Sequence, residues 1–308
     1  MAAPKRERPQ FLSQVEVIQT PVIPTGNWAI DTGALRIGGF PCGRISEVYG
    51  AESGGKTTLV LQTCAQANKA GKAALFIDAE HALDPERAIQ LGCSRERLAV
   101  YQPSSAEDAI DTLYHECASG DYGIIVVDSA AALTPLAELE KSAADSTIGL
   151  QARLLSTGLR KVASVASNTQ TCVLFTNQVR QKIGVTFGSP NTTPGGNALR
   201  FYTSMRVEVT RISTNKDAND KPISNTVRVK AVKNKMAEPY RQVDVELVYS
   251  LGYDNRGTVF DFAVEQNKIK RSGAWFSMGD RKLGQGRAVA LAALSDEDIF
   301  NIQKELVC

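Results

Sequence analysis

The sequence predicts an α/β protein with a mostly parallel β-sheet, helices on both faces of that sheet, an antiparallel extension and a small C-terminal α/β unit. Between residues 37 and 250, short apolar runs alternate with amphipathic stretches of helix length. Strands separated by such helices favour βαβ units and therefore a parallel sheet. After Met205 the strand-like runs follow one another without helices, which predicts the antiparallel extension.

Each predicted element rests on a local pattern. Apolar, β-rich runs predict the parallel strands at Ile45–Tyr49, Ala73–Asp78, Leu98–Gln102, Ile124–Asp128 and Cys172–Asn177. Amphipathic spacing predicts helices over Thr57–Ala70, Pro85–Leu91, Ala106–Ala118 and Gly149–Ser167. The later strands are predicted at Met205–Ile212, Thr226–Val232 and Gln242–Tyr249. Ser295 is a suitable N-cap for a last helix, because three acidic residues follow it in the first turn.

Three regions are predicted along the chain: residues 1–36, 37–253 and 254–308. The first is polar, interrupted by prolines and short of periodicity, the second holds the sheet, and the third is the small C-terminal unit. No apolar run approaches the roughly 20 residues that span a bilayer, and Met1–Gln10 is polar and basic, unlike a secretory signal.

Cysteine and histidine usage argues against a zinc site or a disulfide framework. The six cysteines are scattered without CxxC spacing, and the chain has only two histidines. This pattern fits a reducing compartment, so we expect a cytoplasmic protein without a membrane partner.

Charge is distributed unevenly although the net charge is only +2. No Asp or Glu occurs between Ser146 and Val207, a stretch that holds seven basic residues: Arg153, Arg160, Lys161, Arg180, Lys182, Arg200 and Arg206. Such a block creates a local positive field that suits a polyanion. A solvated basic surface accounts for the clustering equally well.

A phosphate-binding loop is predicted where GAESGGKT, residues 50–57, fits the pattern G-x-x-x-x-G-K-[ST]. Its glycines let backbone N–H groups turn toward phosphate oxygens, Lys56 reaches the β- and γ-phosphates, and the Thr57 hydroxyl suits Mg²⁺. A β-rich run precedes the loop and a helical segment follows it, as this motif requires. The predicted contacts are Gly50, Glu52, Ser53, Gly54, Gly55, Lys56, Thr57 and Thr58.

Two further strands are predicted to deliver carboxylates to the same edge of the sheet, where ligands of open α/β sheets bind. Asp128 follows an apolar strand, with Ser129 beside it, and is predicted to hold Mg²⁺ through water. Asp78 and Glu80 follow another strand, and period-2 alternation places both on one side. Either could polarise an attacking water, whereas His81 is more simply a structural residue.

A second functional segment runs from Val179 to Arg200. It mixes basic residues with two isolated apolar residues, Ile183 and Phe187, and with Gly, Pro, Asn and Thr. Cations that follow phosphates and apolar side chains that pack on bases suit single-stranded nucleic acid, although an ordinary surface loop is the simpler alternative. Another loop, Glu138–Gly149, leads into the helix with Arg153 and Arg160.

Five blocks, in this order and spacing, resemble the bacterial RecA-type recombinases: GAESGGKTT, LFIDAEHALDP, IIVVDSAAALTP, TNQVRQKIGVTFGSPNTTPGGNALRFY and VKNK. The resemblance covers about residue 25 to the C-terminus and suggests a divergent or phage-borne member. It implies a P-loop RecA-type core that hydrolyses ATP with Mg²⁺. It also implies a helical filament on single-stranded DNA that pairs with homologous duplex and exchanges strands, in DNA repair and the SOS response.

The resemblance also implies roles for individual residues. Glu80 rather than Asp78 activates water, Asp84 contacts the adenine edge, and Gln178 senses the γ-phosphate. Lys233 and Lys235 reach the ATP of the neighbouring subunit. The implied DNA contacts are Ile148, Arg153, Ser156, Arg160, Arg180, Lys182, Ile183, Phe187, Gly195, Gly196 and Asn197, and duplex DNA meets Lys268, Lys270, Arg271, Arg281, Lys282 and Arg287.

The chain departs from the family in three places. The N-terminal segment is short, with Phe11–Ile18 as a reduced subunit-contact helix, and the sequence ends at Cys308 without an acidic tail. We expect easier duplex binding and weaker Mg²⁺ dependence from the missing tail. Arg87 and Arg256 stand where the family tends to place tyrosines around adenine, so we expect ATP binding with an altered base preference.

Two other functions use the same features. A ring-forming motor would assemble closed hexamers and unwind DNA without strand exchange. A regulatory protein would bind ATP and DNA without turnover, but Lys56, Thr57, Glu80 and Asp128 argue for hydrolysis.

Overall fold

The computed structural model describes residues 20–140, 149–181, 191–192, 194–195 and 197–306. The predicted helix Phe11–Ile18 lies outside these ranges. Within them, no helix is long and apolar enough to cross a bilayer.

The main sheet has nine strands within the described residues, in the order β13–β12–β11–β10–β3–β7–β6–β4–β5. Neighbours from β10 to β5 are parallel, and those from β10 to β13 are antiparallel. The strands are β3 (Ile45–Gly50), β4 (Ala73–Asp78), β5 (Leu98–Tyr101), β6 (Tyr122–Asp128), β7 (Cys172–Gln178), β10 (Met205–Lys216), β11 (Pro222–Asn234), β12 (Gln242–Val248) and β13 (Gly252–Tyr253). The predicted fold class is confirmed.

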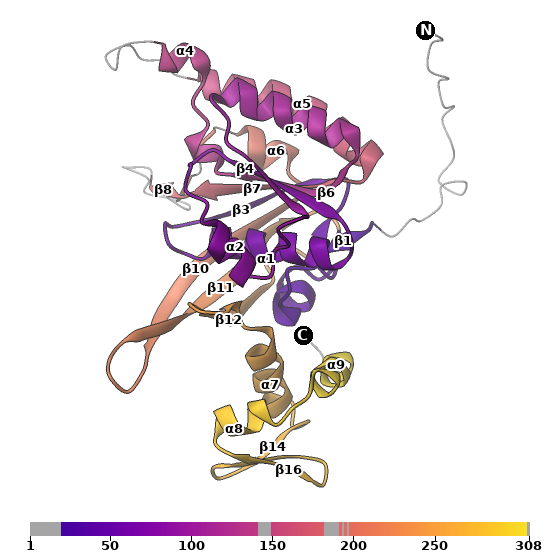
Figure 1. The fold of residues 1–308 in the computed structure, drawn as a ribbon, viewed down its shortest axis with the longest axis vertical. Coiled ribbons are helices and arrows are strands. Elements are labelled where there is room, and N and C mark those ends of the chain that lie inside the picture. Colours follow the sequence, from indigo (N-terminus) through magenta and orange to yellow (C-terminus); the bar gives the residue numbers. More distant parts are fainter. Residues whose placement is uncertain (1–19, 141–148, 182–190, 193, 196, 307–308) are drawn as a thin grey trace, which may run out of the picture.

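Helices cover both faces of this sheet (Figure 1), and each face has its own buried apolar cluster. On one face lie α1 (Lys56–Lys69) and α2 (Pro85–Gln90). On the other lie α3 (Ala106–Ser119), α5 (Leu150–Thr169) and α6 (Ala198–Tyr202). Short helices η3 (Ala130–Ala132) and α4 (Leu136–Leu139) lead toward α5.

Side-chain caps fix where several helices begin. Ser105 accepts a hydrogen bond from the Asp108 amide at the start of α3, and Ser295 forms a capping box with Asp298 at the start of α9 (Asp296–Glu305). The predicted cap at Ser295 is therefore confirmed. Helices α3 and α5 approach closely at Gly158, where a Cβ atom would lie 2.3 Å from Cγ2 of Ile110.

The described part of the N-terminal region, residues 20–36, packs in the core. Strand β1 (Val22–Ile23) pairs with β2 (Phe40–Pro41), and a five-residue π-helix, η2 (Ile30–Ala34), follows. Ile30 and Leu35 are fully buried. No periodic pattern marks these elements in the sequence, because they are short and pack against distant parts of the chain.

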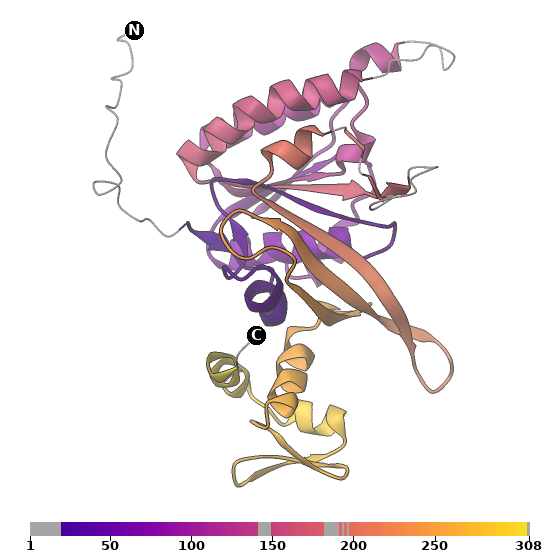
Figure 2. The same cartoon turned by 180° about the vertical axis from the view of Figure 1, so that it is seen from behind.

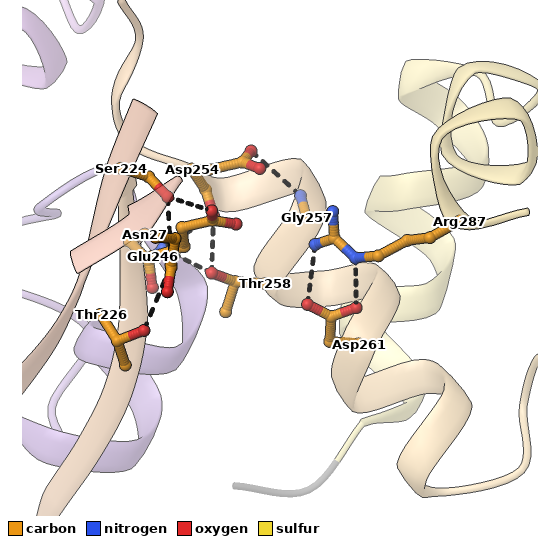
Figure 3. A network of polar contacts seen from close by, with 10 residues as sticks. Asn27, Ser224, Thr226, Glu246, Asp254, Gly257, Thr258, Asp261 and Arg287 are labelled. Carbon is orange, nitrogen blue, oxygen red and sulfur yellow. Dashed lines mark hydrogen bonds and ion pairs between the residues drawn. The ribbon is translucent and has the colours of Figure 1, made fainter. Parts of the chain in front are cut away.

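The C-terminal unit has a separate apolar core below the main sheet in Figure 1. It consists of α7 (Asn255–Glu265), β14 (Lys270–Ser272), β15 (Trp275–Met278), β16 (Arg281–Gln285), α8 (Arg287–Ala292) and α9 (Asp296–Glu305). Figure 3 shows Arg287 of α8 bound to the carboxylate of Asp261 on α7 through two nitrogens.

The N-terminal region clamps the first turn of α7. The Asn27 amide donates to the Asp254 carbonyl at 3.2 Å and to the Thr258 hydroxyl at 3.0 Å (Figure 3). The Trp28 ring stands edge-on to Phe262, with centroids 5.4 Å apart. The orientation of the C-terminal unit therefore depends on residues near the other end of the chain.

Strands β10 and β11 form a long hairpin that extends beyond the body of the protein (Figure 2). The sequence predicted shorter strands, because the outer part of the hairpin is mostly polar and lacks apolar alternation. Two short strands, β8 (Arg180–Gln181) and β9 (Asn191–Thr192), pair within the segment predicted to be irregular.

Candidate nucleotide and DNA site

The phosphate-binding loop joins β3 to α1. Gly55 has a φ of 99°, and a Cβ there would lie 2.7 Å from the Tyr253 hydroxyl, so only glycine fits. Tyr253 in turn donates to the Gly55 carbonyl at 3.3 Å. This fixed turn presents the N-terminus of α1, whose free N–H groups favour an anion.

Lys56 lies at the start of α1 with 8% of its surface exposed. Its Nζ donates to the Ala51 carbonyl at 2.8 Å, so the side chain curls back over the loop. Burial lowers the pKa of Lys56, while the carboxylates of Asp128, Glu80 and Glu52 oppose that shift. Among the other predicted loop contacts, Glu52 and Ser53 are exposed and Thr58 is half-buried.

Asp128 ends β6 beside the loop. The Thr57 hydroxyl donates to its Oδ2 at 2.8 Å, and the Thr176 hydroxyl donates to its Oδ1. Burial raises the pKa of Asp128, and these two hydrogen bonds oppose the shift. A hydroxyl and a carboxylate at hydrogen-bond distance form the hard oxygen set that Mg²⁺ prefers, so these residues fit the metal.

Glu80 lies next to this pair. Its Oε1 accepts a hydrogen bond from Ser129 Oγ at 2.5 Å and a longer one from Gln178 Nε2 at 3.4 Å. The carboxyl ends of β4, β6 and β7 thus meet beside the phosphate-binding loop, as expected for a ligand edge of a parallel sheet.

Asp78 has a different environment. It is 2% exposed and accepts hydrogen bonds from the amides of Ala82 and Leu83 and from Gln102 Nε2 at 3.0 Å. The expectation that alternation places Asp78 and Glu80 on one side is wrong, because β4 ends at Asp78 and the chain turns. His81 lies exposed in that turn with a φ of 54°.

The three residues predicted around adenine lie on two helices, α2 and α7. Asp84 is the N-cap of α2, where Oδ1 accepts from the amides of Glu86 and Arg87. Arg87 follows on the same helix. Arg256 lies on α7 within the C-terminal unit, where its guanidinium contacts the Asp296 carboxylate and, at 2.7 Å, the Leu294 carbonyl.

Lys233 and Lys235 lie apart from the phosphate-binding loop of their own chain. The register places Lys233 beside Arg206 on β10, and Arg206 beside Glu47, three residues before Gly50. Lys233 Nζ donates to the Arg200 carbonyl at 2.7 Å. Burial lowers the pKa of Lys233, and three nearby cations, Lys235, Arg206 and Arg200, lower it further.

Several predicted DNA contacts gather where α5 and α6 lie side by side. Arg153 and Arg160 are exposed on α5, and Arg160 Nε donates to the Tyr202 hydroxyl at 3.2 Å. Ser156 and Asn197 line one cavity of about 420 Å³ between the two helices. Gly195 packs on α5 at Leu155.

Other predicted contacts lie outside the described residues: Ile148, Lys182, Ile183, Phe187 and Gly196. Arg180 lies in β8, described through its backbone alone. The sequence analysis missed Thr176 and Tyr253 near the nucleotide and Asn177 beside Gln178. For Thr176 and Asn177, the polar run Thr-Asn-Gln at the end of an apolar strand was the only indication in the sequence.

Sequence models of two domains match nearly the whole chain: the RecA N-terminal domain over residues 10–254 and the RecA C-terminal domain over residues 257–304. The chain belongs to the RecA family. Protein RecA of Salinispora arenicola is 50% identical over 91% of this chain and 80% of its own length. Protein RecA of Clavibacter michiganensis is 50% identical over 86% and 73%. Protein RecA of Borreliella burgdorferi strain ZS7 is 49% identical over the same shares.

Solved structures agree with this fold. The crystal structure of the RadB recombinase matches with a TM-score of 0.58 at 21% identity, over 75% of this chain and 98% of its own. RecA family membership makes this protein a RecA-type recombinase of the P-loop ATPase class, with DNA recombination and repair as its field of action. Neither the ring-forming motor nor the regulatory alternative is favoured.

Proposed function

We propose that this protein assembles on single-stranded DNA as an ATP-bound helical filament, pairs it with homologous duplex and exchanges strands. The observation that carries the proposal is the contact between Gln178 and Glu80. Gln178 ends the strand that leads directly into the basic segment, residues 179–200. One side chain therefore connects the hydrolytic carboxylate with the segment suited to DNA.

The nucleotide is held by residues that are already in place. The α1 N-terminus and Lys56 would bind the phosphates, Thr57 and Asp128 would hold Mg²⁺, and Asp84 and Arg87 would flank the adenine. The metal would neutralise charge on the phosphates. Lys56 contributes a cation that burial has partly desolvated, which strengthens its attraction to phosphate oxygen.

Glu80 is the group we propose to orient and deprotonate the attacking water. Ser129 and Gln178 both donate to Oε1, which leaves Oε2 to accept a hydrogen bond from water. Asp78 is unsuited to this role, since its oxygens already accept bonds from the following turn.

Lys233 and Lys235 would complete the site of a neighbouring subunit, since the register keeps them from their own phosphate-binding loop. Cations supplied across a subunit contact stabilise charge on the transferring phosphoryl group, so hydrolysis waits for assembly. We assign the contact to the N-terminal region, residues 1–36, the ATPase core to 37–253 and the duplex contact to 254–308.

Single-stranded DNA would lie along Arg153, Ser156, Arg160 and Asn197, where α5 and α6 meet. Duplex DNA would meet the C-terminal unit, mainly at Lys270 and Lys282. Three other basic residues there, Lys268, Arg281 and Arg287, already pair with carboxylates. Phosphate contacts of this kind weaken steeply with salt.

The decisive experiment measures ATP hydrolysis with and without single-stranded DNA and images the same samples. DNA-stimulated turnover with open helical filaments supports the proposal, and a strand-exchange assay completes it. Closed rings, or turnover indifferent to DNA, contradict it. Repressor cleavage on the same filaments tests a role in the SOS response, and cell fractionation tests the proposed cytoplasmic location.

A further inference from the structure

Two neighbouring residues at the end of β7 face opposite sides of the main sheet. Gln178 reaches Glu80 at the nucleotide site. Asn177 shares its face with Phe175, which packs in the apolar cluster beneath α5 and α6. One strand end therefore borders the nucleotide on one face and the DNA-facing helices on the other.

Every polar atom of the Asn177 side chain is engaged, and the residue is fully buried. Its Nδ2 donates to Glu47 Oε1 at 3.0 Å and to the Pro194 carbonyl at 3.2 Å. Its Oδ1 accepts from the backbone N–H of Gln178 at 3.0 Å. This amide thus joins the residue that contacts Glu80 to the far end of the basic segment.

Glu47 holds that amide in place. It is fully buried, and its Oε2 accepts from Arg206 Nε at 2.5 Å. The Arg206 guanidinium lies over the Tyr49 ring, 4.6 Å from its centroid. A buried, paired carboxylate is costly to disturb, so Glu47 is a fixed support for Asn177.

The end of the basic segment is held at a second point. Gly195 follows Pro194 and packs on α5, where a Cβ would lie 2.7 Å from Leu155 Cδ1. A shift of α5 or of the basic segment on DNA binding would therefore be transmitted through Gly195 to the Pro194 carbonyl. Because Asn177 binds both that carbonyl and the Gln178 amide, the shift reaches Gln178.

We propose that Asn177, supported by Glu47, is a positioning residue that couples DNA at the basic segment to the Gln178–Glu80 contact. The inference rests on the proposed function, since it explains how DNA stimulates hydrolysis. Asn177 is fully buried and acts through Gln178, whose backbone N–H donates to its Oδ1.

The test exchanges donor and acceptor between the two buried residues. In the double variant N177D/E47Q, the new amide at 47 can donate to the new carboxylate at 177, and the network keeps one carboxylate. The contact between the two residues is restored, but position 177 has lost the N–H that bound Pro194. The single variant N177D, which sets two carboxylates against each other, shows whether the exchange rescues folding.

We expect the double variant to fold, to hydrolyse ATP without DNA at the wild-type rate, and to keep the wild-type KM for ATP. Its DNA-stimulated kcat should fall by about fivefold to tenfold, the effect of about one net hydrogen bond. Full stimulation would overturn the proposal. A parallel fall of both rates would overturn it too, since a purely structural role predicts that result.

A second measurement needs no variant. Hydrogen exchange of the wild-type peptide that ends at Gln178 should change when single-stranded DNA is added to the ATP-analogue complex. Unchanged exchange contradicts the coupling. Wild-type hydrolysis indifferent to DNA contradicts the proposed function itself, and the first assay identifies that outcome before variants are compared.

Discussion

Asp78 and Glu80 stand two residues apart, yet the end of one strand gives them different chemistry. The Asp78 carboxylate accepts hydrogen bonds from two backbone amides of the next turn, whereas the Glu80 carboxylate accepts them from Ser129 and Gln178. The residues alone left both open as the hydrolytic carboxylate, because alternation cannot show where a strand stops.

Replacing Glu80 with Gln should leave ATP and DNA binding intact and reduce turnover by about 10²–10⁴-fold, because the amide cannot accept a proton. Nucleotide binding by fluorescence and phosphate release measure the two effects separately. Asp78→Asn is the matched control, and it should lower stability more than turnover. Normal hydrolysis by E80Q would show that the base is elsewhere.

Asp31, in the π-helix η2, predicts an unusual pH dependence of stability. Its side chain is 8% exposed, and burial raises its pKa from 3.8 to about 7, although the Thr25 amide donates to it. Between these two values the folded carboxyl keeps a proton that the unfolded chain has lost. The contribution of Asp31 to the free energy of unfolding is therefore largest at low pH, falls as the pH rises toward 7, and is constant above that.

Asp31→Asn keeps the acceptor for Thr25 without the ionisation. Its stability advantage over the wild type should grow from pH 4 to 7, by up to about 4 kcal/mol. Urea unfolding at several pH values measures this difference. Parallel curves for the two proteins would mean that Asp31 has the same pKa in the folded and unfolded chains, which contradicts the prediction.

At the scale of elements, segments with a clear apolar pattern or cap were predictable, and short segments without one were not. The parallel strands and α1, α3 and α5 lie within a few residues of their predicted ranges. The π-helix η2, the β1–β2 pair and α6 have too few residues for a period, and distant contacts stabilise them. For the same reason, motifs revealed Lys56, Thr57 and Asp128, whereas Asn177 and Glu47, 130 residues apart, gave no sign of their contact.

At the contact of α3 with α5, the effect of Gly158→Ala on stability depends on the balance between gained helix propensity and overpacking. Alanine at position 158 gains about 1 kcal/mol of helix propensity over glycine. Its Cβ, however, would lie 2.3 Å from Ile110 Cγ2, and overpacking a core costs about 1–3 kcal/mol. We therefore expect Gly158→Ala to lower the free energy of unfolding by about 1 kcal/mol.

Ile110→Leu removes the Cγ2 branch, so the double variant G158A/I110L should recover most of that loss. Thermal unfolding of the three variants forms a mutant cycle. If the two effects simply add, the helices do not meet at this pair of residues.

At the scale of the whole molecule, we propose that one chain carries only part of a hydrolytic site, because the sheet register keeps Lys233 and Lys235 from their own phosphate-binding loop. The two ends of the chain also depend on each other, because Asn27 and Trp28 hold α7. Under this proposal, hydrolysis requires two neighbouring copies of the chain.

Mixed filaments test this division directly. E80Q and K235A should each be nearly inactive with DNA, but an equal mixture should regain about a quarter of wild-type activity, since head-to-tail contacts pair them at random. As a control, an equal mixture of wild type and E80Q in the same buffer shows how far an inactive subunit alone lowers the activity of a filament. No recovery in mixtures that do form filaments would place both residues in one subunit's site.

At the end of β7, function depends on the number of residues in the strand. Residue 177 faces the DNA-side helices and residue 178 faces the nucleotide because a strand turns its side chains by half a revolution at each step. One residue inserted or removed between Cys172 and Gln178 would turn each of these two side chains to the opposite face of the sheet, although the sequence motifs on either side would be unchanged. The number of residues in this strand is therefore under functional constraint, although no single side chain carries that constraint.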